Sequence, residues 1–383
     1  MLIIRIVSGK LLKNKMNTNN SDMKRILILS LTVSLFSFTG CSIDKTTIDK
    51  AKLDAYFDTL ANNNKFMGSV AISKNNDLIY SKSVGFANVE HRLKANENTK
   101  YRIGSISKTF TAVLIFKAIE ENKLDLDQTI EKFFPTIKNA DKITISHLLS
   151  HRSGIPGYRD WETFSKQFKT KQELLDLIIE SGSESEPGTR EHYSDPNFVL
   201  LTFILEEIYQ KPYPEILEEK IINPLGLKNT YYGGKVNTKN NESNSYKYTN
   251  GKWEIEPETN MSILLGAGAI ISTPMDLLLF SNALFNESLI SANSLKQMKT
   301  SKEWICMGFL PVPYTPFYDK KGFGHGGDVD NCISLFGYFP DDNISFAFAT
   351  NGINFDFQDV TAVILSAVYD KPFEIPEFGE KIK

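Results

Sequence analysis

Strand-like segments lie near both ends of the chain, and this limits the folds the chain can adopt. On the N-terminal side, GSVAISKNNDLIYSKSVGFA (68–87) contains two strand-like runs around the polar turn 74–77, which predicts a hairpin. On the C-terminal side, the apolar runs 305–310, 332–340 and 344–352 also read as strands. We therefore expect a sheet made from both ends of the chain.

Helical patterns flank these strands and fill the middle of the chain. Residues 43–61 and 106–119 carry apolar side chains at mainly helical spacing, and a further helix is predicted from about 358 to 369. Within residues 136–260, three more helical patterns are separated by turns that contain Gly and Pro. The polar stretch 231–253 in this region is expected to be a long surface loop.

This order of elements predicts two lobes. The sheet lobe comprises residues 48–135 with 261–372, an all-helical lobe of residues 136–260 is inserted into it, and a tail of residues 373–383 follows. The 383 residues are ample for a large core. An insertion of this kind usually leaves a cleft between the lobes, where binding sites tend to lie.

Residues 1–40 are expected to be a leader outside the fold. Met23-Lys24-Arg25 precedes thirteen mostly apolar residues (26–38), a run too short to span a bilayer and typical of a signal peptide. The run ends in Phe38-Thr39-Gly40-Cys41, which resembles a bacterial lipoprotein cleavage box. The alternative is a plain secretory signal beside an unrelated cysteine.

The lipoprotein resemblance implies a lipidated Cys41 followed by a tether of residues 41–47. Buried acyl chains, at about 0.8 kcal/mol per methylene, would anchor the protein to a membrane surface. We expect a location in the bacterial cell envelope, either lipid-anchored or periplasmic. Ser42 after Cys41 favours the outer membrane, on its periplasmic face, by analogy with other lipoproteins.

Composition gives no support for nucleic acid, metal or cofactor binding. The net charge is −3 and no stripe of Lys and Arg is present, so nucleic acid is not an expected partner. Cys306 and Cys332 lack metal-ligand partners at useful spacing, and two buried free thiols are slightly favoured over a disulfide. His147 and His151 are four residues apart, but Leu148 replaces the Glu of a zinc-protease helix.

The stretch YRIGSISKTF (101–110) places Ser105 three residues before Lys108 at the start of an apolar helical pattern. Ser-x-x-Lys occurs three times in the chain, but the pair 21/24 lies in the leader and the pair 42/45 lies in the tether beside Cys41. Ser105 could be a helix N-cap. However, a capping box has Glu or Gln where Lys108 stands, and an ammonium is disfavoured at a helix N-terminus. A nucleophile with its partner is the alternative hypothesis.

Four further segments extend this match. They are HLLSHRSGI (147–155), EPGTREHYSDPNFVLL (186–201), GAGAIIST (266–273) and GFGHGGD (322–328). With the Ser-x-x-Lys pair, they resemble, in order, recurrent segments of the serine penicillin-recognising enzymes, in the branch related to class C β-lactamases. The resemblance covers roughly residues 48–370. It implies an α+β fold of the β-lactamase/DD-peptidase type, with an antiparallel sheet flanked by helices.

The resemblance also implies catalytic roles. Ser105 would be the nucleophile that forms an acyl-enzyme, Lys108 would share its proton, and Tyr193 would act as base for the serine and acid for the leaving group. The backbone N–H groups of Ser105 and Asp328 would form the oxyanion hole. Gly326 and Gly327, which lack side chains, would let a substrate backbone lie alongside their strand.

Two positions depart from the family pattern. Asp195 stands where the family reads Tyr-x-Asn, and its charge would raise the pKa of Lys108, which makes Tyr193 the better base. Asp195 could also be an N-cap, because Pro196 and an apolar helix follow it. His325 stands where β-lactamases of this branch usually have lysine, and a histidine is only partly charged near neutral pH.

The expected function is a serine hydrolase that acts through an acyl-enzyme on D-amino-acid peptides or small esters. The alternatives are a true β-lactamase and a penicillin-binding or sensor protein that acylates without turnover. The expected partners are a small-molecule or peptide substrate and the membrane. The sequence leaves the oligomeric state open.

Overall fold

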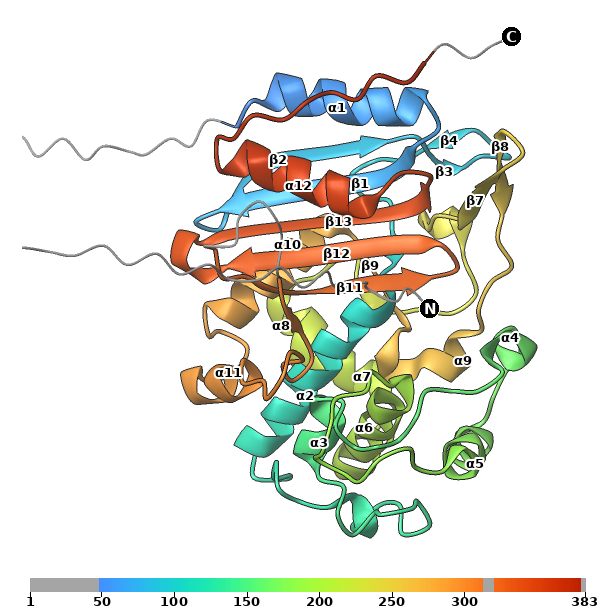
Figure 1. The fold of residues 1–383 in the computed structure, drawn as a ribbon, viewed down its shortest axis with the longest axis vertical. Helices are drawn as coiled ribbons and strands as arrows, with labels where there is room; N and C mark the ends of the chain where they lie inside the picture. Colours follow the sequence, from blue (N-terminus) through green and yellow to red (C-terminus); the bar gives the residue numbers. More distant parts are fainter. Residues whose placement is uncertain (1–47, 313–319, 380–383) are drawn as a thin grey trace, which may run out of the picture. The chain divides into compact units, whose positions relative to one another are not determined.

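A six-stranded antiparallel sheet joins the two ends of the chain in the computed structural model, which describes residues 48–312 and 320–379 (Figure 1). β1 pairs with β13 from Phe66 opposite Ile353 to Lys74 opposite Ile344, which confirms the prediction of a sheet made from both ends. The strand order is β10 (Leu310–Pro311), β11 (Phe323–Val329), β12 (Cys332–Phe339), β13 (Ile344–Ile353), β1 (Phe66–Lys74) and β2 (Asp77–Val84).

Helices cover both faces of this sheet. α1 (Lys50–Asn62) and α12 (Phe357–Val368) pack on the face that carries Val70 and Phe348. The neighbouring residues along the same strands, such as Ala71, point to the opposite face, where α10 (Pro274–Phe285) and α2 (Ser107–Glu120) pack. Figure 1 shows the sheet between these two layers of helices.

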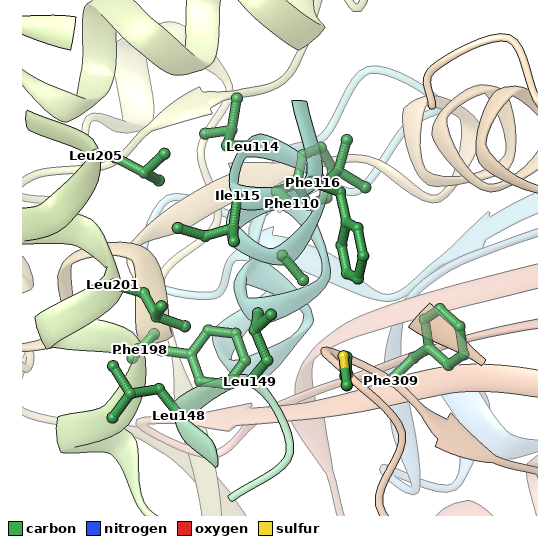
Figure 2. Packing of buried hydrophobic residues seen from close by; sticks show 14 of the residues in the cluster. Phe110, Leu114, Ile115, Phe116, Leu148, Leu149, Phe198, Leu201, Leu205 and Phe309 are labelled. Carbon is green, nitrogen blue, oxygen red and sulfur yellow. The ribbon is translucent and has the colours of Figure 1, made fainter. Parts of the chain in front are cut away.

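Helix α2 is the centre of the larger core. Eleven of its residues are buried, as expected for a helix that is apolar around its whole circumference. Figure 2 shows its side chains among those of α3 (Ile145–Leu149) and α6 (Asp195–Tyr209). On the side toward the sheet, the ring of Phe110 stacks on that of Phe280 from α10, with centroids 3.7 Å apart.

The remaining elements connect these layers. The short helices are α4 (Trp161–Phe164), α5 (Lys171–Ser181), α7 (Tyr213–Leu217), α8 (Asn223–Leu225), α9 (Met261–Leu264) and α11 (Ala292–Met298). A small sheet consists of β5 (Tyr101–Arg102), β9 (Ile270–Ser272) and β6 (Tyr231–Tyr232), while β3 (Phe86–Asn88) pairs with β4 (Leu93–Lys94) and β7 (Tyr246–Thr249) with β8 (Lys252–Ile255).

Two local predictions are wrong. Residues 231–253 are not a loop, because β7 and β8 form a hairpin there, and the region 136–260 is therefore not all-helical. The sequence feature that predicts this hairpin is Asn250-Gly251, the dipeptide that type I′ hairpin turns prefer. Both residues have positive φ in the structure. The run 305–310 is largely not a strand, because Gly308 turns the chain at φ +89° and the Met307 N–H donates to Met298 O.

The described residues belong to one unit, Thr46–Lys383, and the division into two lobes stays a prediction. The leader, Cys41 and the tether lie outside the described residues. Among the helices that are described, none has the length and apolar character needed to cross a membrane.

The stacked pair of Phe110 and Phe280 gives a stability prediction. Phe280→Ala should lower the free energy of unfolding by about 3–5 kcal/mol, since it leaves a cavity between α2 and α10. Leu279→Ala, at the adjacent and 45% exposed position, should change it by less than about 0.5 kcal/mol. Urea unfolding of both variants measures the free energies, and similar losses in the two would contradict the packing of Phe280 between α2 and the sheet.

Candidate active site

Ser105 lies in a tight turn immediately before α2. The 3-10 turn Gly104–Ile106 follows β5, and α2 begins directly after it at Ser107. No side-chain cap hydrogen bond is made at the start of either element, so Ser105 is not the N-cap considered from the sequence. Its hydroxyl instead accepts a hydrogen bond from Lys108 Nζ at 3.0 Å.

The Lys108 ammonium is fully buried and has more hydrogen-bond partners than N–H groups. Its Nζ lies 3.0 Å from Ser105 Oγ, 2.7 Å from Ala267 O and 2.6 Å from Asp195 Oδ1, and the Tyr193 hydroxyl is a fourth partner. Burial by itself lowers the pKa of Lys108, but Asp195 and the Tyr193 hydroxyl outweigh it, and the pKa lies above its ordinary value. Lys108 is therefore charged, and it has no lone pair with which to take the Ser105 proton.

The Tyr193 hydroxyl interacts with both Ser105 and Lys108, and these hydrogen bonds lower its pKa. Burial of the phenol has the larger effect and Asp195 adds to it, so the pKa of Tyr193 is raised overall. The ring is nevertheless 38% exposed, with Lys108 Nζ 5.0 Å from its centroid. The hydroxyl end thus lies inside the site, while the ring forms part of its wall and remains accessible.

His151 holds Tyr193 in place, a role that the sequence did not reveal. Its ring stacks on that of Tyr193 with centroids 4.3 Å apart. Its carbonyl accepts from the N–H of His192, and its Nδ1 accepts from the N–H of Ser194 at 3.0 Å. Both neighbours of Tyr193 are therefore fixed to one residue. Burial, reinforced by the charge of Lys108, lowers the pKa of His151 well below its ordinary value, so the ring is neutral.

Asp195 is the first residue of α6 and not its N-cap. Ser194 occupies the cap position, and its hydroxyl donates to Pro156 O, so no side chain caps this helix. The Asp195 carboxylate binds Lys108 instead, at the helix N-terminus, where a negative charge is favourable. The predicted proximity of Asp195 and Lys108 is thus confirmed.

The residues predicted for the oxyanion hole lie on β11. The Val312 N–H donates to Gly322 O at the β10 edge. Successive residues of an antiparallel strand direct their backbone N–H and C=O groups to opposite edges of the strand. The N–H groups of Gly326 and Asp328 therefore face the same edge as Gly322 O. β10 pairs only with Phe323 and Gly324, so no β10 residue lies opposite Gly326 or Asp328. A Cβ on Gly104 would lie 2.8 Å from the Asp328 nitrogen, so the Ser105 turn packs directly against this point.

The two adjacent glycines of β11 differ in their surroundings. A Cβ on Gly327 would lie 1.9 Å from Ile103 O, whereas the nearest atoms to a Cβ on Gly326 are 3.7 Å away. Gly327 is therefore required for the contact between β11 and the Ser105 turn. Gly326 has no such constraint from the described part of the chain, and its proposed role beside a substrate backbone stays a prediction.

His325 is buried at the back of the site. Its Nδ1 lies 2.6 Å from Gly326 O, and since a carbonyl only accepts, Nδ1 carries the proton. Burial, together with the charge of Lys108, lowers the pKa of His325 to about 4. The expectation of a partly charged histidine at neutral pH is therefore wrong, and the ring is neutral there.

A buried ion pair ties the Ser105 turn to the end of β11. Arg102, three residues before Ser105, binds Asp330 at 2.7 Å and Glu258 at 2.8 Å. Asp330 also accepts from Lys166 at 2.8 Å. No local sequence pattern predicts the pair of Arg102 and Asp330, because the two residues are separated by more than 200 positions.

The other candidate features carry no chemistry in the described residues. Cys306 and Cys332 are buried free thiols, as favoured from the sequence. No group of three or more His, Cys, Asp or Glu side chains in this part of the chain could hold a metal ion. A cavity of about 720 Å³ lies beside α5, α6 and α9, and Lys166 and Glu258 of this ion-pair network line it, but Ser105, Lys108 and Asp195 do not.

The fold and this site place the chain in a known family. The sequence pattern of the family described as Beta-lactamase matches residues 53–369, and the chain belongs to that family. The octameric penicillin-binding protein homologue from Pyrococcus abyssi has a similar structure, with a TM-score of 0.75 and 28% identity, covering 85% of this chain and 78% of that one. The predicted fold class is thereby confirmed.

The chain is also similar in sequence to two curated proteins. It is 27% identical over 295 residues to the penicillin-binding protein PbpX of Bacillus subtilis (strain 168), which covers 76% of this chain and 73% of PbpX. It is 28% identical over 226 residues to the teichoic acid D-alanine hydrolase of Staphylococcus aureus (strain MRSA252), which covers 59% of this chain. The match spans 55% of that hydrolase, little more than half its length.

The two glycines of β11 give a matched pair of variants. Gly327→Ala should separate β11 from the Ser105 turn, because the new Cβ would overlap Ile103 O, and should cost about 1–3 kcal/mol of unfolding free energy. Gly326→Ala should stay within about 0.5 kcal/mol of the wild type. Urea unfolding tests both, and equal losses would contradict the contact between β11 and Ile103.

The buried neutral His325 predicts a loss of stability in acid. A histidine in the unfolded chain titrates near about 6.5, so the unfolded state binds more protons than the folded state between that pH and about 4. The free energy of unfolding should therefore fall as the pH is lowered through this range, by roughly 3 kcal/mol at its lower end. Urea unfolding at several pH values would show this loss in the wild type.

His325→Gln is the control for that titration. The variant lacks the imidazole but keeps His151 and every other group, so the difference between the two proteins reports His325 alone. Curves that run parallel from pH 7 to pH 4 would contradict a lowered pKa for His325.

Proposed function

We propose that this protein is a serine hydrolase that acts through an acyl-enzyme on D-amino-acid peptides or small esters. The observation that carries the proposal is the environment of Ser105 Oγ. It accepts a hydrogen bond from a charged, buried lysine and lies in a turn packed against the Asp328 N–H at the open edge of β11. A developing alkoxide and an oxyanion would both be stabilised there.

Tyr193 is the proposed proton carrier. Lys108 is charged and its N–H groups are all donated, so its part is to stabilise negative charge on Ser105 Oγ and on the tyrosine oxygen. The pKa of Tyr193 is raised, which argues against a resting phenolate. We infer a concerted relay, in which Tyr193 takes the Ser105 proton as it gives its own to the leaving group.

The reaction then balances in two halves. Ser105 Oγ bonds to the substrate carbonyl carbon, the carbonyl oxygen becomes an anion between the N–H groups of Ser105 and Asp328, and the leaving group departs with the proton from Tyr193. In the second half, water attacks the acyl carbon and gives a proton to Tyr193. Tyr193 gives its own proton to Ser105 Oγ as the bond from that oxygen to the acyl carbon breaks, which releases the acid and restores the Ser105 hydroxyl. Removal of one oxyanion donor typically costs about 2.7–4 kcal/mol of transition-state stabilisation.

The charges of the site favour this proposal over a β-lactamase. A penicillin carries a carboxylate, for which a free cation is a suitable partner. In the described residues of the site, Lys108 is fully engaged and His325 is neutral. The similarity to a protein named as a D-alanine hydrolase supports D-amino-acid substrates. A cell-envelope location is proposed from the leader pattern and the names of the relatives.

Intact-mass spectrometry tests the proposed reaction. After mixing with p-nitrophenyl acetate or D-alanyl esters, the wild type should gain one acyl mass and release p-nitrophenol, while Ser105→Ala should do neither. Ser288→Ala, which changes an exposed serine, should behave like the wild type. Exposure to benzylpenicillin in the same assay separates a turnover enzyme from a protein that only forms a lasting adduct. Absence of any adduct and any hydrolysis in the wild type would reject the proposed function.

A further inference from the structure

Two side chains of the site, Asp195 and His325, each leave one acceptor atom available. One oxygen of Asp195 binds Lys108, but the other makes no hydrogen bond within the described residues, and the side chain is 36% exposed. His325 donates through Nδ1 to Gly326 O, which leaves Nε2 with a lone pair. The three N–H groups of Lys108 are already donated. Within the described residues, the site thus offers these two acceptors to a substrate, while Lys108 and His325 supply no free cationic donor.

Asp195 is also close enough to Ser105 to contact the acyl group. Its carboxylate and Ser105 Oγ bind the same lysine nitrogen, at 2.6 and 3.0 Å, so they lie within two hydrogen-bond lengths of each other. In an amino-acid acyl group, the α-nitrogen is only two covalent bonds from the carbonyl carbon that bonds to Ser105. A free α-ammonium on such a group can therefore reach Asp195.

From this geometry we propose that Asp195 determines specificity by binding the free α-ammonium of the acyl donor. The inference rests on the proposed serine hydrolase function and narrows its substrates to aminoacyl esters and amides with an unblocked amine. An ammonium would form a charge-assisted hydrogen bond with the second carboxylate oxygen, while the first remains on Lys108. A donor whose amine is acylated carries no charge at this position and loses that bond.

The other exposed acid near the site does not fit this role. Asp328 pairs opposite Ile333, and its side chain lies on the other face of β11 from Gly327, because side chains alternate along a strand. Gly327 is the residue that faces Ile103 and the Ser105 turn. Asp195 is therefore the carboxylate that shares a side of the strand with the nucleophile.

A matched pair of donors tests the inference. The rates of hydrolysis, as kcat/KM, are compared for D-alanine p-nitroanilide and N-acetyl-D-alanine p-nitroanilide at pH 6, where an α-amine is protonated. The wild type should prefer the free amine by roughly tenfold or more. In Asp195→Asn this ratio should fall to near one, even though both rates drop as Lys108 loses its partner. Asp195→Glu, which keeps the charge, should keep much of the preference.

Asp341→Asn is the control, since it removes an exposed charge beyond the far end of β12 and should leave the ratio unchanged. A wild type without preference for the free amine, or an Asp195→Asn variant with the wild-type ratio, would overturn the inference. In the latter case Asp195 would only hold the charge of Lys108. Hydrolysis of p-nitrophenyl acetate distinguishes these outcomes from failure of the proposed function, in which no donor acylates Ser105.

Discussion

The buried charge of Lys108 determines how the site is assembled. An ammonium withdrawn from water is costly unless every N–H finds an acceptor, and a buried ion pair with a missing partner is strongly destabilising. Lys108 meets this requirement with one partner from each of three segments that are distant in sequence: the turn before α2, the first residue of α6 and the loop before β9. The same three bonds that compensate for burial thus bring Ser105, Asp195 and the backbone of Ala267 together.

A second constraint fixes the nucleophile from the side of the sheet. Side chains at positions 104 and 327 would overlap backbone atoms of the facing segment, so only glycine allows the turn and β11 to come this close. Ser334 Oγ donates to Ile103 O from the neighbouring strand, and Arg102 binds Asp330 just beyond β11. The position of Ser105 therefore depends on backbone packing against β11 on the side of the sheet and on the charge of Lys108 on the other side.

Much of this arrangement could be predicted from patterns that are local in the sequence. Alternation and turn residues identified the hairpin of β1 and β2, and the ordered motifs identified Ser105, Lys108, Tyr193, Asp195 and the β11 residues. The motifs could not predict the surroundings of individual side chains in the folded protein. The acid-shifted pKa of His325 follows from burial and from Lys108, and the role of His151 follows from a ring stacked on Tyr193 across 42 positions of sequence. Neither the pKa of His325 nor the role of His151 can be predicted from the residues adjacent to them in the sequence.

The replacement of an amide by Asp195 has consequences beyond the lysine. With an amide in that place, Lys108 would be a buried cation of reduced pKa, able to lose its proton and act as a base. With a carboxylate, the pair is neutral overall and the lysine keeps its charge, which supports the proposed transfer of the proton through Tyr193. The second oxygen of the same carboxylate is the acceptor proposed for the substrate ammonium. The carboxylate at position 195 therefore bears on both proposals: the residue that transfers the proton and the substrates that the site binds.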